Sequence, residues 1–160
     1  MFFSHPLRVI LIGAALLPAA LWARDTPSNM EPEATPALVA DPLRAPRESI
    51  AAGQWRAALS QLQALQPQMA RNADLHNLLG YVYRKQASPD LDKAFEHYRM
   101  ALDIDPGHRG AHEYIGEAYL MRRQPAQARE HLETLERLCG GPACEEYRDL
   151  AKALRAYQGQ

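Results

Sequence analysis

The stretch ADLHNLLGYVYRKQASPDLDKAFEHYRMALDIDP, residues 73–106, predicts a pair of helices that pack against each other. Ser88 can cap the second helix, and Pro89 can occupy its first turn, where proline is tolerated. Pro106 ends the pair because proline cannot continue a helix. Gly80 lies where the two helices should cross, and a larger side chain there would push them apart. The stretch therefore predicts a helical hairpin.

The pattern of this hairpin recurs along the chain at intervals of 36 and 34 residues. The matching sets are Ala58, Leu62 and Leu65, then Ala94, Tyr98 and Ala101, and finally Ala128, Leu132 and Leu135. Leu79-Gly80 with Tyr83 also matches Ile115-Gly116 with Tyr119. A repeat of this length predicts stacked hairpins, because one hairpin alone cannot bury its apolar face. The expected fold class is all-α.

These motifs resemble the tetratricopeptide repeat (TPR). The resemblance rests on Leu79-Gly80-x-x-Tyr83, on Ala94-x-x-x-Tyr98-x-x-Ala101 and on Asp105-Pro106. It covers residues 47–142, with the best copy at 73–108, a second copy at 109–142 and a partial first copy. In the first copy Pro42 and Pro46 interrupt the helix that should precede Gly53-x-Trp55-x-x-Ala58. The resemblance implies a helical-hairpin solenoid of about two and a half TPR units.

Two further segments are similar to a group of small exported bacterial TPR proteins. They are HRGAHEYIGEAYL, residues 108–120, and LCGGPACEEYRDL, residues 138–150, in which a Cys pair is followed by Glu-Glu-Tyr. This resemblance implies an exported chain with the same fold. It carries no site residues from that group to this sequence.

Residues 142–157 predict one more helix, and we assign the C-terminal region, 143–160, to it. An apolar stripe at spacings of three and four runs along this helix and consists of Tyr147, Leu150, Leu154 and Tyr157. The last hairpin of a solenoid would otherwise expose its core face, so we expect a capping helix. A helix that binds a membrane or a partner is the alternative.

Residues 1–23 have the order of a secretory signal peptide: a short leader with Arg8, an apolar run, Pro18 and then small residues. We expect cleavage after Ala23, with Ala20 as the alternative, and a periplasmic or secreted product. A membrane anchor is the other interpretation, but its apolar segment has 15 residues, whereas a span needs about 20. The sequence therefore predicts no membrane contact after cleavage.

Residues 24–46 contain five prolines and little apolar periodicity. Such a segment cannot bury enough apolar surface to offset the entropy lost on ordering it. We expect a semi-extended linker that provides distance and carries no chemistry.

Composition argues against nucleic-acid binding and against catalysis. The chain has 18 Lys and Arg against 19 Asp and Glu, a formal net charge of −1, so it offers no basic field to gather phosphates. Glu113 and Glu117 share one helical face, but no serine or second group completes an acid–base arrangement with them. We expect a chain that is not an enzyme and needs no cofactor.

Cys139 and Cys144 flank Gly-Gly-Pro-Ala. In an exported chain such a pair predicts a disulfide, which would join the capping helix to the last repeat. Closing so short a ring stabilises the fold by roughly 2 kcal/mol. A redox-active pair is a minor alternative, because it would prefer two intervening residues and this pair has four.

Metal handling in the periplasm is the alternative function. His108 and His112 are four residues apart, and with His131 or the Cys pair they could form a soft site for copper or zinc. The spacing matches no known ligand motif. His76 and His112 hold matching places in two repeats where packing residues belong, so the structural interpretation is that both are partly buried and hydrogen-bonded. His97 is expected to face solvent.

The first helix of each hairpin lines the concave side of such a stack, which forms a groove for a peptide or a partner helix. The candidate contact residues are Asp74, Asn77, Tyr81, Arg84, Glu113, Glu117 and Leu120. Asn77 can hydrogen-bond an extended backbone, Tyr81 supplies contact area, and Arg84 can clamp a carboxylate. Glu113 and Glu117 favour a basic segment of the ligand.

The sequence thus predicts a non-enzymatic protein–protein interaction module in the bacterial periplasm. Two and a half repeats form a small groove, which predicts micromolar binding or avidity through weak self-association. Trp55, on the incomplete first hairpin, is the candidate contact for a second copy.

Overall fold

A computed structural model describes residues 41–158, which all lie within the unit Leu38–Gln160. This range contains seven α-helices and one short 3-10 helix, and no strand. The elements are α1 Arg44–Ala51, α2 Trp55–Leu65, α3 Ala73–Lys85, α4 Leu91–Ile104, α5 Arg109–Met121, α6 Pro125–Cys139, η1 Gly141–Ala143 and α7 Glu145–Gln158. None of the helices in the described range combines the length and hydrophobicity that a membrane span requires. The predicted leader and the linker up to residue 40 lie outside the described residues.

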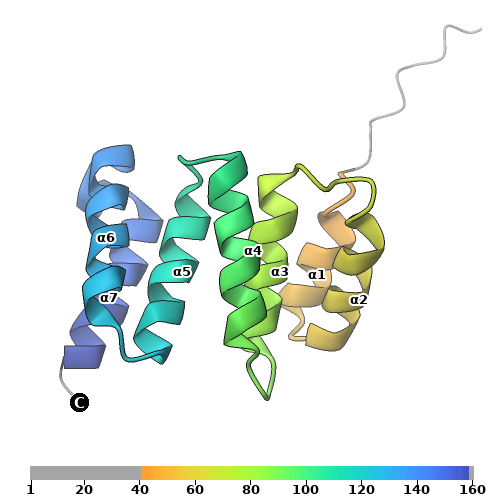
Figure 1. Ribbon diagram of the computed structural model, residues 1–160, viewed down its shortest axis with the longest axis horizontal. Helices are drawn as coiled ribbons and strands as arrows, with labels where there is room; N and C mark the ends of the chain where they lie inside the picture. Colours follow the sequence, from red (N-terminus) through yellow and green to blue (C-terminus); the bar gives the residue numbers. More distant parts are fainter. Residues whose placement is uncertain (1–40, 159–160) are drawn as a thin grey trace, which may run out of the picture. The chain divides into compact units, whose positions relative to one another are not determined.

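The helices pack as hairpins that follow one another in chain order, from α1 in orange to α7 in blue (Figure 1). Helices α1 and α2, α3 and α4, and α5 and α6 each pack against one another. The first helix of a hairpin also contacts its neighbours, since α3 packs on α2, and α5 packs on both α3 and α4. The all-α, helical-hairpin fold predicted from the repeat is confirmed for this part of the chain.

Side-chain caps fix where helices α3 and α4 begin. The Asn72 side chain accepts a hydrogen bond from the Leu75 N–H at 2.8 Å, at the start of α3. Asp90 accepts from the Lys93 N–H at 3.1 Å, at the start of α4. The predicted cap of α4, Ser88, is wrong: α4 begins three residues later, and Pro89 precedes the helix. Each cap satisfies an N–H that has no partner within the helix.

The first hairpin is more complete than predicted. Helix α1 begins at Arg44, so Pro46 lies in its first turn and does not interrupt it. Proline is tolerated there because the N–H groups of the first turn have no intrahelical partner. The helix has 8 residues against 13 in α3. The partial first copy of the repeat is therefore a hairpin with a short first helix.

Gly80 lies where α3 meets α4, as predicted. An ideal Cβ at Gly80 would lie 2.6 Å from two ring carbons of Tyr98 and 3.0 Å from the Ala94 carbonyl oxygen. At Gly116 the neighbour is a side chain of α7: an ideal Cβ would lie 2.6 Å from Leu150 Cδ2. The absence of a side chain at these two positions lets α4 and α7 approach closely.

Helix α7 caps the last hairpin. It packs on α5 and α6, and Leu150 and Leu154 are buried in a cluster with Leu120 and Leu135. The helix begins at Glu145, later than predicted from the sequence, because the short helix η1 occupies the preceding residues. The apolar stripe predicted for this helix thus faces the core.

The turn between α6 and α7 depends on two glycines and a disulfide. Gly140 and Gly141 have φ of +80° and +68°, a left-handed conformation that side chains disfavour. Cys139 and Cys144 form the predicted disulfide, with Cα atoms 5.8 Å apart. The disulfide ties the end of α6 to the start of α7.

Two histidine pairs occupy equivalent places in successive hairpins. The Nδ1 atoms of His76 and His97 lie 3.1 Å apart, and those of His112 and His131 lie 2.9 Å apart. His97 is only 7% exposed, so the prediction that it faces solvent is wrong. Its ring is held between His76 and the stacked ring of Tyr83.

Backbone carbonyls fix the tautomers of these pairs. His76 Nε2 lies 3.0 Å from the Ala70 carbonyl oxygen, and His112 Nε2 lies 3.0 Å from the Pro106 carbonyl oxygen. A carbonyl accepts only, so both Nε2 atoms donate, and in the neutral ring Nδ1 is then an acceptor. The partner histidine donates from its own Nδ1. Both pairs are therefore arranged for neutral imidazoles.

This arrangement predicts a loss of stability in mild acid. Burial lowers the pKa of His97 and His112, and it lowers the pKa of His131 to about 4. An unfolded histidine titrates near pH 6.5, so between about pH 6.5 and 4 the unfolded chain binds more protons than the folded chain. The stability that the neutral histidines give the folded state is fully present above this pH range and is lost as the pH falls through it.

A His131→Gln variant tests this expectation. The Gln amide can still donate to His112 Nδ1 but does not titrate. The stability advantage of wild type over the variant, measured by urea unfolding, should shrink by about 1–2 kcal/mol between pH 7 and pH 4.5. Because both proteins contain the same carboxyl groups, the contribution of these groups to the pH dependence cancels in the difference. If the difference in unfolding free energy between wild type and variant did not change with pH, the assignment of His131 as a neutral histidine in the folded protein would be contradicted.

Candidate interaction groove

Helices α3, α5 and α7 line a continuous hollow. One part of it is lined by Arg84 and Lys85 of α3, by Glu117, Leu120 and Met121 of α5, and by Ala153, Ala156 and Tyr157 of α7. A second part is lined by Glu117, Asp149, Lys152, Ala153 and Ala156. The two parts share Glu117 and the two alanines, so they are one surface, which we call the inner groove. The alanines leave room for a bound segment.

Arg84 lies at the inner groove and is fully engaged within the protein. Its Nη2 forms an ion pair with Glu117 Oε2 at 2.6 Å, and its Nε donates to the Tyr98 hydroxyl at 3.2 Å. The guanidinium carbon lies 5.4 Å from the Tyr81 ring centroid and 5.5 Å from that of Tyr114. The side chain is only 8% exposed. A ligand carboxylate would have to compete with Glu117 for this guanidinium, so the structure gives Arg84 a positioning role.

Glu113 has the opposite character, because it is buried without a partner. The residue is 8% exposed, and no hydrogen bond or ion pair to it is found among residues 41–158. Burial raises its pKa to about 8, and the negative charges of Glu117, Asp149 and Glu146 act in the same direction. Arg84 opposes this effect. The surroundings of this carboxyl group therefore favour its protonated form.

Asn77 is a second polar side chain left without a full set of partners. The residue is 8% exposed, and its Oδ1 is buried with no hydrogen bond in the described range. Its Nδ2 lies 3.1 Å from the position that a Cβ of Gly110 would take. Gly110 is one helical turn before Glu113, so the Asn77 amide lies beside the same face of α5.

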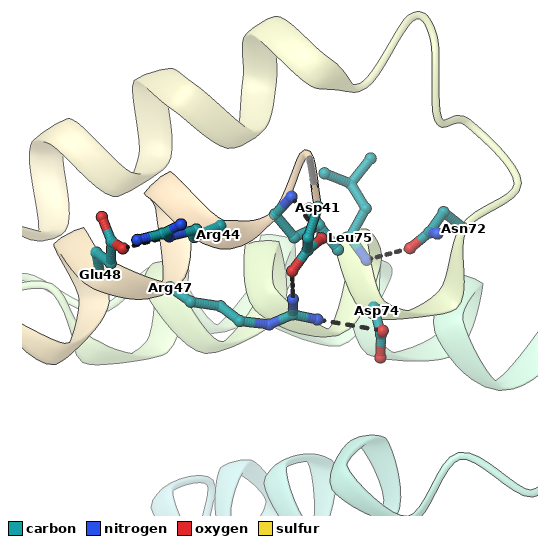
Figure 2. Close-up of polar contacts among 8 residues, drawn as sticks. Asp41, Arg44, Arg47, Glu48, Asn72, Asp74 and Leu75 are labelled. Atoms are coloured by element: carbon teal, nitrogen blue, oxygen red, sulfur yellow. Dashed lines mark hydrogen bonds and ion pairs between the residues drawn. The ribbon is translucent and has the colours of Figure 1, made fainter. Parts of the chain in front are cut away.

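Asp74 links the first helices of three successive hairpins. Figure 2 shows Arg47 of α1 between two carboxylates: it bonds Asp41 at 2.5 Å and reaches Asp74 Oδ2 at 3.3 Å. The other Asp74 oxygen accepts from His108 Nε2 at 3.0 Å. The His108 Nδ1 in turn accepts from the Ala111 N–H at 3.1 Å and caps α5. Asp74 thus connects the starts of α1, α3 and α5.

The remaining predicted contacts differ in how accessible they are. Tyr81 is half-buried and packs against Tyr114, with ring centroids 4.8 Å apart, and against Trp55 at 6.1 Å. Trp55 is likewise half-buried. Glu117 is 26% exposed, and Leu120 is 8% exposed at the apolar end of the inner groove. Of the predicted set, Arg84, Glu117 and Leu120 line the hollow itself.

The contribution of α7 to this groove was not predicted from the sequence. Asp149, Ala153 and Ala156 follow each other at spacings of four and three, away from the apolar stripe of the same helix. That spacing marks a single helix face. The spacing of these three residues could have indicated the face. However, a helix face of small and charged residues cannot be distinguished by sequence from an ordinary solvent-exposed surface.

The residues of the alternative metal site are separated by their other contacts. His108 is engaged with Asp74 and the first turn of α5, whereas His112 points to Pro106 and His131. Both sulfur atoms of the Cys pair are in the disulfide. Among residues 41–158, one group of three ligand-type side chains lies close enough for a metal, and it comprises Cys139, Cys144 and Glu146. Because a disulfide sulfur is a poor ligand, this group favours no metal function.

Comparison with known proteins supports the fold assignment. No protein-family model and no curated protein matches the sequence. Among solved structures, the chain is similar to the crystal structure of a thermophilic TPR protein from Thermus thermophilus. The two are 18% identical, the match covers 75% of this chain and 72% of the other, and the TM-score is 0.61. With three hairpins, a capping helix and this similarity, the described part of the chain has the fold of a TPR solenoid.

Proposed function

We propose that this chain is a non-enzymatic protein-interaction module that binds a peptide or a partner helix in the inner groove. The hollow shared by α3, α5 and α7 is the observation that carries the proposal. First helices of stacked hairpins commonly present such a surface to a ligand segment. The groove also combines charged side chains of both signs with apolar ones at Leu120 and Met121, a mixture that suits a polypeptide segment.

The rigidity of the groove walls supports this function. Arg84 ties α3 to α5 through Glu117 and to α4 through Tyr98. The disulfide and Leu150 hold α7 in place on the other side. A groove that is formed before binding loses less conformational entropy when a ligand enters it.

We further propose that the protein acts in the periplasm. The order of residues 1–23 is that of a secretory leader. The disulfide between Cys139 and Cys144 is consistent with an oxidising compartment. Fractionation of cells that express the full chain tests this part: the processed protein should leave with the periplasmic fraction, and retention of an unprocessed chain in the cytoplasm would contradict it.

Filling the inner groove tests the binding function. Ala156 is exposed and lines both parts of the hollow, so Ala156→Trp should occupy the space without disturbing the core. Ala126→Trp on α6 is the matched control, since Ala126 is exposed and does not line the hollow. Crosslinking in a periplasmic extract should yield the same partner with wild type and Ala126→Trp. The partner should be lost with Ala156→Trp, and its retention would contradict the groove as the binding site.

A further inference from the structure

A second pocket lies between the first two hairpins, at the end where their turns meet. Its volume is about 660 Å³, which is in the usual range for ligand pockets. It shares no lining residue with either part of the inner groove. We call it the turn pocket, and its lining residues are Gly53, Gln54, Trp55, Arg56 and Ala57 on one side, and Gln86, Ala87 and Ser88 on the other.

An extended turn after α3 forms one wall of the turn pocket. Five residues, 86–90, connect α3 to α4, whereas three residues connect α1 to α2 and three connect α5 to α6. In Figure 1 the turn after α3 reaches further down the view than the turn between α1 and α2. The wall is therefore a feature of this hairpin that the regular repeat does not provide.

Trp55 contributes an aromatic ring and a free N–H group to the turn pocket. The residue is half-buried, and its ring packs against Tyr81 with the ring centroids 6.1 Å apart. Within residues 41–158 the indole N–H has no hydrogen-bond partner, yet it is not among the side-chain polar atoms that are buried without one. The N–H is therefore open to solvent. An exposed indole of this kind can pack on an apolar group and donate to an acceptor beside it.

The turn pocket is rich in hydrogen-bond donors. Four side chains of its lining carry N–H groups, and they are Gln54, Trp55, Arg56 and Gln86. None of these four side chains forms a hydrogen bond with another residue in the part of the chain that the structure describes. A matching ligand offers many acceptors and few donors. A proline-rich segment has this character, because proline has no backbone N–H and the polyproline II conformation leaves the carbonyl groups free.

The charge of the turn pocket is positive. Arg56 is the one charged side chain of the lining; it is exposed, and it has no ion pair within residues 41–158. Lys85, which directly precedes the lining residue Gln86, is likewise exposed and without an ion pair in that range. The acidic residue of the same turn, Asp90, is paired with Lys93 at 3.4 Å. Charge complementarity therefore favours a ligand that carries a carboxylate.

We propose that the turn pocket binds a proline-rich, acidic segment of a partner polypeptide, with a proline ring on the indole of Trp55 and a carboxylate at Arg56. The inference goes beyond the proposed function and does not depend on the inner groove. Aromatic rings with donors beside them are the usual surface for polyproline II segments. Such a segment is already extended before it binds, so it loses little conformational entropy on binding.

Fluorescence anisotropy with synthetic peptides tests the turn pocket in the full chain. The probe is a fluorescein-labelled repeat of Pro-Pro-Glu. Because polyproline II has three residues per turn, the glutamates of this repeat lie along one edge and the prolines along the other two. One counterpart carries lysine in place of glutamate, and another carries glycine and serine in place of the two prolines. The first tests the charge of the ligand, and the second tests its conformation.

Two variants of the lining test the two contacts separately. Arg56→Glu reverses the charge at an exposed position, and Trp55→Leu removes the aromatic ring. We expect the probe to bind Arg56→Glu at least about fivefold more weakly than wild type, and Trp55→Leu about tenfold more weakly. Arg129→Glu, at an exposed position of α6, is the matched control and should bind like wild type. Ala156→Trp, which fills the inner groove, should also bind like wild type, and neither counterpart peptide should bind.

Circular dichroism separates a binding loss from a folding defect. Trp55 packs against the apolar core, so Trp55→Leu can lower the stability of the fold. Arg56→Glu is independent of this effect, because Arg56 is exposed and forms no ion pair or hydrogen bond through its side chain within residues 41–158. The variant should retain the helical signal of wild type. If Arg56→Glu bound the probe like wild type, the proposal would be overturned, whatever the result for Trp55→Leu.

The remaining outcomes separate the turn pocket from the inner groove and from self-association. If binding of the probe is lost only with Ala156→Trp, the inner groove is its site and the turn pocket is wrong. If either counterpart binds wild type as well as the probe does, or if the probe does not bind, the proposed recognition is contradicted and the inner groove is unaffected. If sedimentation without peptide shows association of wild type that Trp55→Leu abolishes, the occupant is a second copy of this chain, and the proposal is overturned.

Discussion

A Gly80→Val variant should unfold with a free energy about 2–3 kcal/mol lower than wild type. The Cβ of the new side chain would lie 2.6 Å from the Tyr98 ring and 3.0 Å from the Ala94 carbonyl oxygen. Tyr98 is fully buried and its hydroxyl is held by Arg84, so the ring cannot move aside without breaking that contact. Helix propensity alone predicts a small gain in the free energy of unfolding, because valine is a better helix former than glycine. The sign of the effect therefore separates the packing explanation from local propensity.

Urea unfolding followed by circular dichroism measures this effect. Ala57→Val is the control, because Ala57 is exposed on α2 and the change introduces the same β-branched side chain into a helix. The control should lose less than about 1 kcal/mol. Equal stability of Gly80→Val and wild type would mean that α3 and α4 do not approach as closely as described.

A Leu150→Ala variant should lose about 3 kcal/mol of unfolding free energy, because Leu150 is fully buried. Its side chain fills the space that the missing side chain of Gly116 leaves between α5 and α7. The cavity left by alanine would weaken the contact of α7 with the last hairpin. Amide hydrogen exchange in α7 should then become faster than in α3 and α4, because α7 opens before the rest of the structure unfolds.

Leu138→Ala is the matched control for this prediction. Leu138 lies on α6 near the same turn but is 43% exposed, so its truncation should change the stability by less than about 1 kcal/mol. If Leu150→Ala and Leu138→Ala both lost only a small amount of unfolding free energy, the role of α7 as a capping helix would be contradicted.

The hairpins could be predicted from the sequence because their strongest signals are local. Gly80 with Tyr83 and Tyr98 marks a close helix contact wherever the rest of the chain lies, and the contact is present. The helix starts were harder to predict. Ser88 and Asp90 are equally good caps, and the choice falls on Asp90, whose N–H donates to the Tyr83 carbonyl oxygen at 3.1 Å. That bond joins the end of one helix to the start of the next, which a pattern of single residues does not show.

The groove was harder to predict because its chemistry depends on contacts between hairpins. Arg84 and Glu117 were both expected to meet a ligand, yet they meet each other across α3 and α5. Asp149 lies away from the apolar stripe of the capping helix, and its place in the hollow depends on the orientation of α7 after the turn. The orientation follows from Gly140, Gly141 and the disulfide together. The helix faces could therefore be predicted from the sequence. Which charged side chains pair with each other could be seen only in the folded structure.

An NMR titration of the isotope-labelled chain with a synthetic peptide of the partner segment recovered by crosslinking tests the groove most directly. The amide signals that shift most should belong to α5 and α7 around Glu117, Asp149 and Ala153, with smaller shifts in the last turn of α3. The exposed faces of α2, α4 and α6 should not respond. Shifts that cluster on those three helices, or no shifts at saturating peptide, would contradict the assignment of the inner groove as the surface that meets a partner.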